Sequence, residues 1–267
     1  MLVAAAVCPC PPLLVPEVAT GAAPELDAAR AACADALGLL AAARPDVLYV
    51  VGAAPEGGHG VYPAGSTGSF AGFGVDLSVR LGDVPSGDAD GPPAQHRPAD
   101  GLSTDGLPVD GRPVGEDTGG RPLPASLAVG AWLLGRTGWA DAPIEGLGVE
   151  EAATPDVCAA LGRGLADSAR RVALLVLGDG SACRTVKAPG YLDERAEGFD
   201  AEAARALGTA DVAALLALDT ELAYELKAAG RAPWQVLAGA AEGAGLDGRL
   251  LFEDAPYGVG YFVAAWS

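Results

Sequence analysis

Basic and imidazole side chains are scarce in this sequence. It contains two lysines, Lys187 and Lys227, and two histidines, His59 and His96. Its 17 lysine and arginine residues stand against 35 aspartate and glutamate residues, which gives a formal net charge of −18. Such a charge repels nucleic acid and anionic membranes and offers no polybasic anchor. We therefore expect a small-molecule substrate rather than a nucleic-acid or membrane partner, and leave homo-oligomer formation open.

Long apolar runs and nucleotide-binding motifs are also missing. No uninterrupted apolar stretch of about 18 residues occurs, which predicts that there is no transmembrane helix. The N-terminal apolar run stops at Val7 before prolines and lacks a basic leader, so a first strand is a better interpretation than a signal peptide. Neither G-x-G-x-x-G nor GxxxxGK[ST] is present, and Ser181 does not lie in a G-x-S-x-G elbow. The odd number of scattered cysteines favours reduced thiols and a cytoplasmic protein: Cys8, Cys10, Cys33, Cys158 and Cys183.

The N-terminal third has the pattern of a βαβ unit. Leu2–Val7 is a short apolar strand that ends at Cys8-Pro9-Cys10-Pro11-Pro12, where prolines remove ladder donors. Residues 24–43 open with proline and early acidic residues and continue with apolar helical spacing, which predicts a helix. Residues 47–51 form the second strand. The order strand, helix, strand implies a parallel sheet, so we expect a single α/β domain over residues 1–267, a three-layer α/β/α fold with a mainly parallel central sheet.

The remainder of the chain alternates predicted helices and strands around one insertion. Residues 82–124 are rich in Gly, Pro and Asp, include His96, and are expected to be a flexible insertion within the domain, either passive or a lid over the site. Strands are expected at 75–81, 249–253 and 258–265. Helices are expected at 126–136, 154–171, 200–207, 211–217, 220–229 and 233–244.

Reactive side chains are concentrated in one stretch, Arg171 to Asp200. Val172–Leu177 is a continuous apolar run, typical of a strand buried on both faces of a parallel sheet. Ligands in open α/β sheets bind beyond the carboxyl ends of the strands, so the polar residues that follow are candidate site residues. The candidates for catalysis are Asp179, Ser181 and Cys183. Arg184 and Lys187 are cationic and are candidates for binding an anionic substrate. A solvated loop that caps the next helix is the alternative.

Three features of the sequence resemble a known family. They are a first strand ending in Cys-Pro-Cys-Pro-Pro, a second strand ending near Gly52 and the motif LGDGSACRTxKAPGYLDxRAxxFD. The chain resembles an actinobacterial branch of the class III extradiol ring-cleavage dioxygenase superfamily, which includes the catalytic subunit of protocatechuate 4,5-dioxygenase and the Memo-like proteins. The resemblance implies non-haem Fe(II), held by two histidines and a carboxylate, and an aromatic substrate.

Several residues at the family's ligand positions differ from the family pattern. Cys10 stands where the first family histidine lies, and His59 comes four residues after the position of the second. Ala182 replaces the catalytic histidine after the third strand. A late glutamate ligand would fall near Trp234-Gln235, and Glu253 is the nearby carboxylate.

Two functional hypotheses follow from the resemblance. In the first, the protein is a dioxygenase-like metalloenzyme with an altered centre at Cys10, His59 and Glu253, acting on a small anionic or aromatic substrate. Cysteine ligands would favour zinc, copper or thiolate-bound iron over plain Fe(II). In the second, the metal is lost and the protein is a non-catalytic, Memo-like binding or regulatory protein. If Cys10 and Cys183 are ordinary buried thiols, no cofactor is needed. We further expect Asp179, Ser181 and Arg184 to face one pocket with the Cys10 loop.

Overall fold

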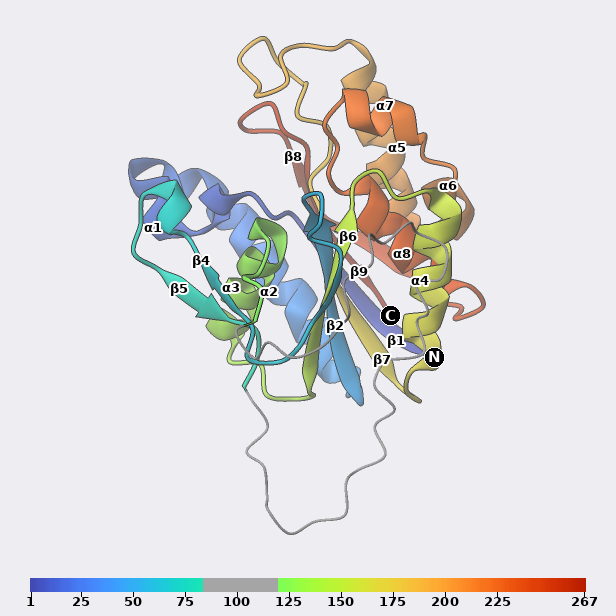
Figure 1. Ribbon diagram of the computed structural model, residues 1–267. Helices are drawn as coiled ribbons and strands as arrows, with labels where there is room; N and C mark the ends of the chain where they lie inside the picture. The colour runs from blue at the N-terminus through green and yellow to red at the C-terminus, as the bar shows by residue number, and fades with distance from the viewer. Residues whose placement is uncertain (84–119) are drawn as a thin grey trace.

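The computed structural model describes residues 1–83 and 120–267 (Figure 1). Its centre is a seven-stranded sheet in the order β3-β6-β2-β7-β1-β9-β8. The four middle strands β6, β2, β7 and β1 are parallel, and β3, β9 and β8 are antiparallel to their neighbours. The strands are β1 Leu2–Cys8, β2 Val47–Ala54, β3 Gly60–Tyr62, β6 Ile144–Glu150, β7 Val172–Leu177, β8 Gly248–Asp254 and β9 Tyr261–Trp266. A separate pair joins β4 Thr67–Ser69 to β5 Ser78–Arg80.

Helices cover both faces of this sheet, as Figure 1 shows. One face packs against α2 Asp27–Ala42 and α3 Ala125–Thr137, and we call it the α2/α3 face. The other, the α4/α8 face, packs against α4 Pro155–Asp167, α5 Arg195–Thr209 and α8 Arg231–Ala241. The short helices are α1 Pro16–Ala19, α6 Val212–Leu216 and α7 Thr220–Glu225, with 3-10 turns at Pro12–Leu14, Thr20–Leu26 and Ala71–Phe73. The predicted three-layer α/β/α fold is therefore confirmed.

Strand β7 shows why the core has two halves. All six of its residues are buried, and successive side chains point to opposite faces of the sheet. Val172, Leu174 and Val176 belong to the core on the α4/α8 face, whereas Ala173, Leu175 and Leu177 belong to the other. The prediction of a strand buried on both sides is correct.

Strand β6 was not among the predicted elements, although it pairs with β2 along its whole length. Its sequence, IEGLGVE, contains two glycines, which weaken a strand pattern. Tertiary packing explains Gly148, because a Cβ there would lie 2.6 Å from the carbonyl oxygen of Gly58. The predicted strand at 75–81 is also shorter than expected, since β5 covers Ser78–Arg80 and pairs only with β4.

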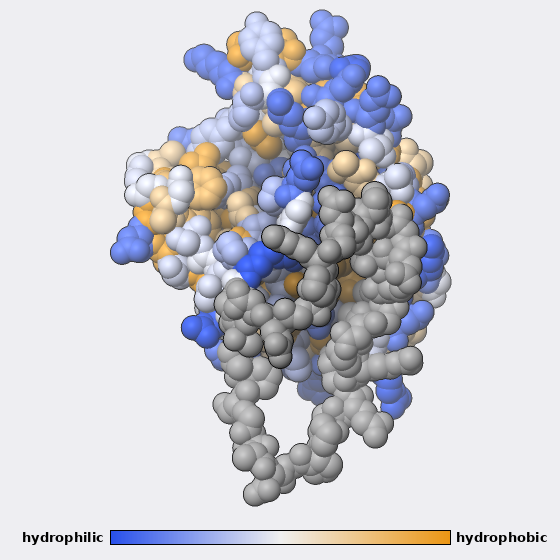
Figure 2. Space-filling model, in the orientation of Figure 1, coloured by the Kyte–Doolittle hydropathy of each residue, from blue (hydrophilic) through white to orange (hydrophobic). Residues whose placement is uncertain are grey.

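The sheet brings the loops that follow four parallel strands to one edge. Loops after β1, β2, β6 and β7 carry Cys10, His59, Glu151 and Asp179 respectively. Residues 84–119, which include most of the predicted insertion and His96, lie outside the described residues. No helix of the described residues is long and apolar enough to cross a membrane. Figure 2 shows hydrophilic side chains spread around the rim of one molecular face, with apolar ones scattered among them.

Candidate functional site

Three residues meet where β1 and β7 end and β9 begins, and we call them the strand-end cluster: Cys10, Asp179 and Tyr261. The backbone N–H of Cys10 donates a hydrogen bond of 2.8 Å to Oδ1 of Asp179. Val7 pairs with Ala264 in the antiparallel ladder, and continuing this register places Tyr261 beside Cys10. Cys10 and Tyr261 belong to the α2/α3 core, and strand alternation directs Asp179 to that face too. Asp179 thus contacts the Cys10 loop, whereas the predicted pocket shared with Ser181 and Arg184 stays a prediction.

The carboxyl group of Asp179 has an unusual protonation equilibrium. Burial raises its pKa from 3.8 to about 7, and the hydrogen bond from Cys10 opposes this rise only in part. The residue nevertheless keeps part of its surface exposed. Among the described residues, none donates a hydrogen bond to its second oxygen, Oδ2. Asp179 therefore gains or loses its proton in the neutral pH range, and within the described part of the chain its Oδ2 accepts no hydrogen bond.

The thiol and the phenol beside Asp179 are both neutral at physiological pH. Burial, followed by the charges of Asp179 and Glu151, raises the pKa of Cys10 well above its ordinary value. Burial and then the Asp179 charge raise the pKa of Tyr261. The thiolate is the form that attacks an electrophile, so Cys10 is poorly suited to act as a nucleophile.

Ser181 and Arg184 belong to a different arrangement, built around Asp200. The buried Asp200 carboxylate accepts hydrogen bonds of 2.7 Å from both the N–H and the hydroxyl of Ser181. Nη1 of Arg184 lies 3.1 Å from the same carboxylate. A Cβ on Gly180 would approach Asp200 Oδ1 to 2.7 Å, and one on Gly260 would approach Oδ2 to 2.6 Å. These residues form a clamp, the Asp200 clamp, which holds the loop after β7.

The Asp200 clamp changes the roles expected of Ser181 and Arg184. The Ser181 hydroxyl donates its hydrogen bond to the Asp200 carboxylate. Among the described residues no histidine belongs to this arrangement, so none there supplies the imidazole base that activates a serine nucleophile. Arg184 is already paired with a buried anion and is not a free clamp for a substrate carboxylate. Of the residues predicted to share a pocket with the Cys10 loop, only Asp179 contacts it.

Cys183 and Lys187 lie away from the strand-end cluster. Cys183 is buried in the core on the α4/α8 face, and its thiol lies 3.5 Å from the carbonyl oxygen of Leu226. Burial, with the charge of Asp193, raises the pKa of this thiol, which disfavours the nucleophilic thiolate. Lys187 is exposed on the loop that precedes α5. The catalytic role predicted for Cys183 and the substrate-binding role predicted for Lys187 stay predictions.

His59 forms its own pair at the carboxyl ends of β2 and β6. Its Nδ1 lies 2.9 Å from Oε1 of Glu150, and the two side chains are 38% and 32% exposed. Arg121 holds this loop by donating to the carbonyl oxygens of Gly57 and His59 while its guanidinium stacks over Tyr62. The pair is a solvent-accessible imidazole oriented by a carboxylate, an arrangement suited to proton transfer or binding.

The three predicted metal ligands are not brought together. His59 adjoins β3 at one edge of the sheet, whereas Glu253 is exposed on β8 at the opposite edge. Cys10 lies at the end of β1, between these edges, and its thiol is neutral. Within residues 1–83 and 120–267, no group of three or more His, Cys, Asp or Glu side chains could hold a metal ion. These residues do not fit the metal centre that the resemblance implies, and metal binding stays a prediction.

Three important residues were not singled out from the sequence. Asp200 closes the LGDG…FD motif, yet its partners become visible only when the loop folds back onto α5. Tyr261 reaches the site through strand pairing with β1, and Glu150 ends a strand that was not predicted. No periodicity in the sequence could have indicated these long-range contacts.

Comparison with known proteins supports the fold. No family model matches the chain, and no curated protein matches it. A similar solved structure is that of the uncharacterized protein JW3007 from Escherichia coli K12, with a TM-score of 0.57 and 16% sequence identity over 99% of each chain. At this identity the likeness is one of fold, and it extends over the whole α/β/α domain.

Proposed function

We propose that the protein is a small-molecule binding protein whose ligand carries a hydroxyl group that meets Asp179 at the strand-end cluster. The observation that carries this proposal is the free Oδ2 of a carboxyl group whose pKa lies at about 7. In its protonated form Asp179 donates a hydrogen bond to a ligand oxygen, and in its ionised form it accepts one from a hydroxyl. The proposal corresponds to the Memo-like, metal-free alternative of the resemblance.

The charges around the cluster favour a neutral ligand over an anion. Arg184 is paired with Asp200, and Lys187 is on an exposed loop, so neither cation serves this site. The charge of Glu151 acts on Cys10 and adds negative potential. The resemblance implies an aromatic substrate, and the buried ring of Tyr261 packs beside the carboxyl group. A neutral, hydroxyl-bearing aromatic compound combines these properties.

Catalysis at the same residue is the second candidate. A general acid or base works best when its pKa is near the working pH, and Asp179 meets this condition. The reaction would be a proton transfer to or from a hydroxyl-bearing aromatic substrate. The donor residues do not support a step through a metal ion, so none is derived.

Catechol is a suitable probe, used without oxygen and with a chelator present so that its oxidation is suppressed. We expect saturable binding by ligand-observed NMR, weakened about tenfold or more by Asp179→Ala, which corresponds to about 1.4 kcal/mol. Asp35→Asn, at an exposed carboxylate on α2, is the matched control and should bind like the wild type. The affinity for catechol should change between pH 6 and pH 8, the range in which Asp179 loses its proton, and Asp179→Asn should abolish that change.

Two outcomes separate the candidates. If catechol binds but its ring protons do not exchange in D₂O, the binding role stands. If they exchange in a protein-dependent manner that Asp179→Asn removes, the catalytic role is favoured. Saturable binding that Asp179→Ala leaves unchanged would contradict both, as would the absence of saturable binding.

A further inference from the structure

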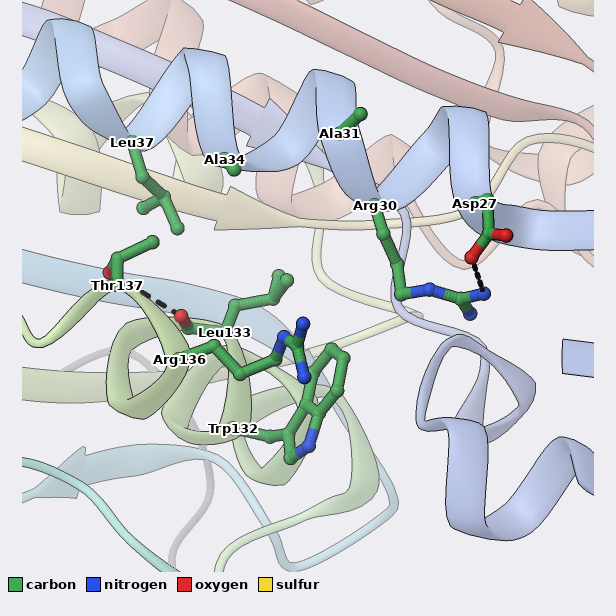
Figure 3. A pocket seen from close by; sticks show the side chains of 9 residues that line it. All are labelled: Asp27, Arg30, Ala31, Ala34, Leu37, Trp132, Leu133, Arg136 and Thr137. Atoms are coloured by element: carbon green, nitrogen blue, oxygen red, sulfur yellow. Dashed lines mark hydrogen bonds and ion pairs between the residues drawn. The ribbon is translucent and has the colours of Figure 1, made fainter. Parts of the chain in front are cut away.

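A second concave site lies between α2 and α3, and none of the strand-end cluster lines it (Figure 3). The groove has a volume of about 410 Å³, which is in the range of small-molecule sites. Its apolar surface comes from Leu37 on α2 and from Trp132 and Leu133 on α3. All three side chains are 8% exposed or less, so the groove is floored by rigid core residues.

One arginine of this groove is already neutralised. Arg30 makes an ion pair of 2.6 Å with Asp27 and donates to the carbonyl oxygens of Leu14 and Ala23. These bonds occupy its guanidinium and tie α2 to the preceding segment. Arg30 therefore contributes structure and little free positive charge.

The other arginine, Arg136, has no carboxylate partner among the described residues. Arg136 is in the last turn of α3, where its charge complements the helix dipole. Its guanidinium carbon lies 5.1 Å from the centre of the Trp132 ring, an arrangement that fixes the plane of the side chain. No carboxylate among residues 1–83 and 120–267 pairs with it, in a protein with a net charge of −18. Figure 3 shows the Arg136 guanidinium beside the Trp132 indole in the groove.

We propose that this groove binds a small planar carboxylate. The carboxylate would meet the edge of the Arg136 guanidinium, whose parallel N–H groups match it in a bidentate manner. The flat body of the ligand would lie over the exposed Ala34 of α2, with Leu37 and Leu133 packed beneath it. The stacked Trp132 holds the guanidinium in place beforehand, which reduces the conformational entropy lost on binding. The ordinary alternative is that Arg136 only covers the Trp132 ring.

Benzoate is the probe, with benzylammonium and benzyl alcohol as charge-reversed and neutral controls. The indole N–H signal of Trp132, assigned by its loss in Trp132→Phe, is followed during titration of the full chain. We expect a saturable shift with benzoate that is weakened about tenfold or more in Arg136→Gln and less in Arg136→Lys. Arg163→Gln, at an exposed arginine paired with Glu242, is the matched control and should bind like the wild type.

Two results would overturn this proposal. One is a shift of equal size and midpoint with benzoate and benzylammonium, which would mean that charge is not recognised. The other is benzoate binding that Arg136→Gln leaves unchanged while the remaining amide signals show a folded protein. Asp179→Ala should leave benzoate binding intact, so this site and the strand-end cluster are tested separately.

Discussion

Replacing Asp179 by asparagine should stabilise the protein above neutral pH. In the folded protein this carboxyl group has a pKa of about 7, compared with 3.8 for the ordinary group. The folded state therefore binds the proton more tightly than the unfolded chain, and its stability falls as the pH rises from about 4 to about 7. Above pH 7 the penalty is complete. Asparagine never ionises, and its side-chain oxygen can still accept the hydrogen bond from Cys10.

The size of the effect follows from the pKa difference. A difference of one in pKa corresponds to about 1.4 kcal/mol, so the penalty in the wild type is at most about 4 kcal/mol above pH 7 and about 1.6 kcal/mol at pH 5. Asp179 keeps part of its surface in water, which reduces both values. We expect the stability advantage of Asp179→Asn to grow by about 1–2 kcal/mol between pH 5 and pH 8.5.

Urea unfolding followed by tryptophan fluorescence at several pH values measures this difference. The lowest value, pH 5, stays above the sequence pI of about 4.3, at which the net charge vanishes. Subtracting the wild-type curve from that of the variant cancels the titration of all other groups. Asp35→Asn should give a flat difference, because Asp35 is exposed. A flat difference for Asp179→Asn, or one that favours the wild type as pH rises, would refute the reasoning.

The remaining predictions concern the Asp200 clamp and the metal hypothesis. Asp200→Ala should destabilise the protein by about 2 kcal/mol or more in urea unfolding, because it leaves the Ser181 N–H, the Ser181 hydroxyl and Arg184 without their acceptor. Glu202→Ala, at an exposed pair, should cost less than about 1 kcal/mol, and equal losses would count against the clamp. Gly180→Ala should cost about 1–3 kcal/mol by crowding the Asp200 carboxylate. By contrast, Gly38→Ala should stabilise the protein by about 0.5–1 kcal/mol, because Gly38 lies within α2 and an added Cβ has no atom within 4 Å. A loss of stability in this variant would contradict the open space that the structure shows around Gly38. Elemental analysis of protein purified without chelator or oxygen should detect no stoichiometric metal whose binding depends on Cys10, His59 or Glu253. Stoichiometric metal that is lost in Cys10→Ala, His59→Ala or Glu253→Gln would revive the metalloenzyme hypothesis.

The alternation of apolar and polar segments was enough to determine the layered fold. β1 and β7 are nearly as predicted, and β2 extends three residues beyond its predicted end. Short continuous apolar runs bounded by proline or glycine are typical of buried strands. The helix expected at 24–43 begins at Asp27, after a 3-10 turn that includes Pro24. Position after β7 predicted a site role for Asp179, which stays a prediction, and the structure places this residue against the Cys10 loop.

Tertiary structure decided which of the candidate residues share a site. Ser181, Cys183 and Arg184 follow Asp179 closely in sequence, yet the loop turns Ser181 and Arg184 to Asp200 and buries Cys183 in the α4/α8 core. His59 and Glu253 lie at opposite edges because the strand order separates β3 from β8. Strand order and loop direction arise from packing between distant segments, and these contacts leave no local pattern. The sequence by itself therefore determined the layers and the edge at which a site could form, whereas only the tertiary structure decided that Cys10, Asp179 and Tyr261 meet there.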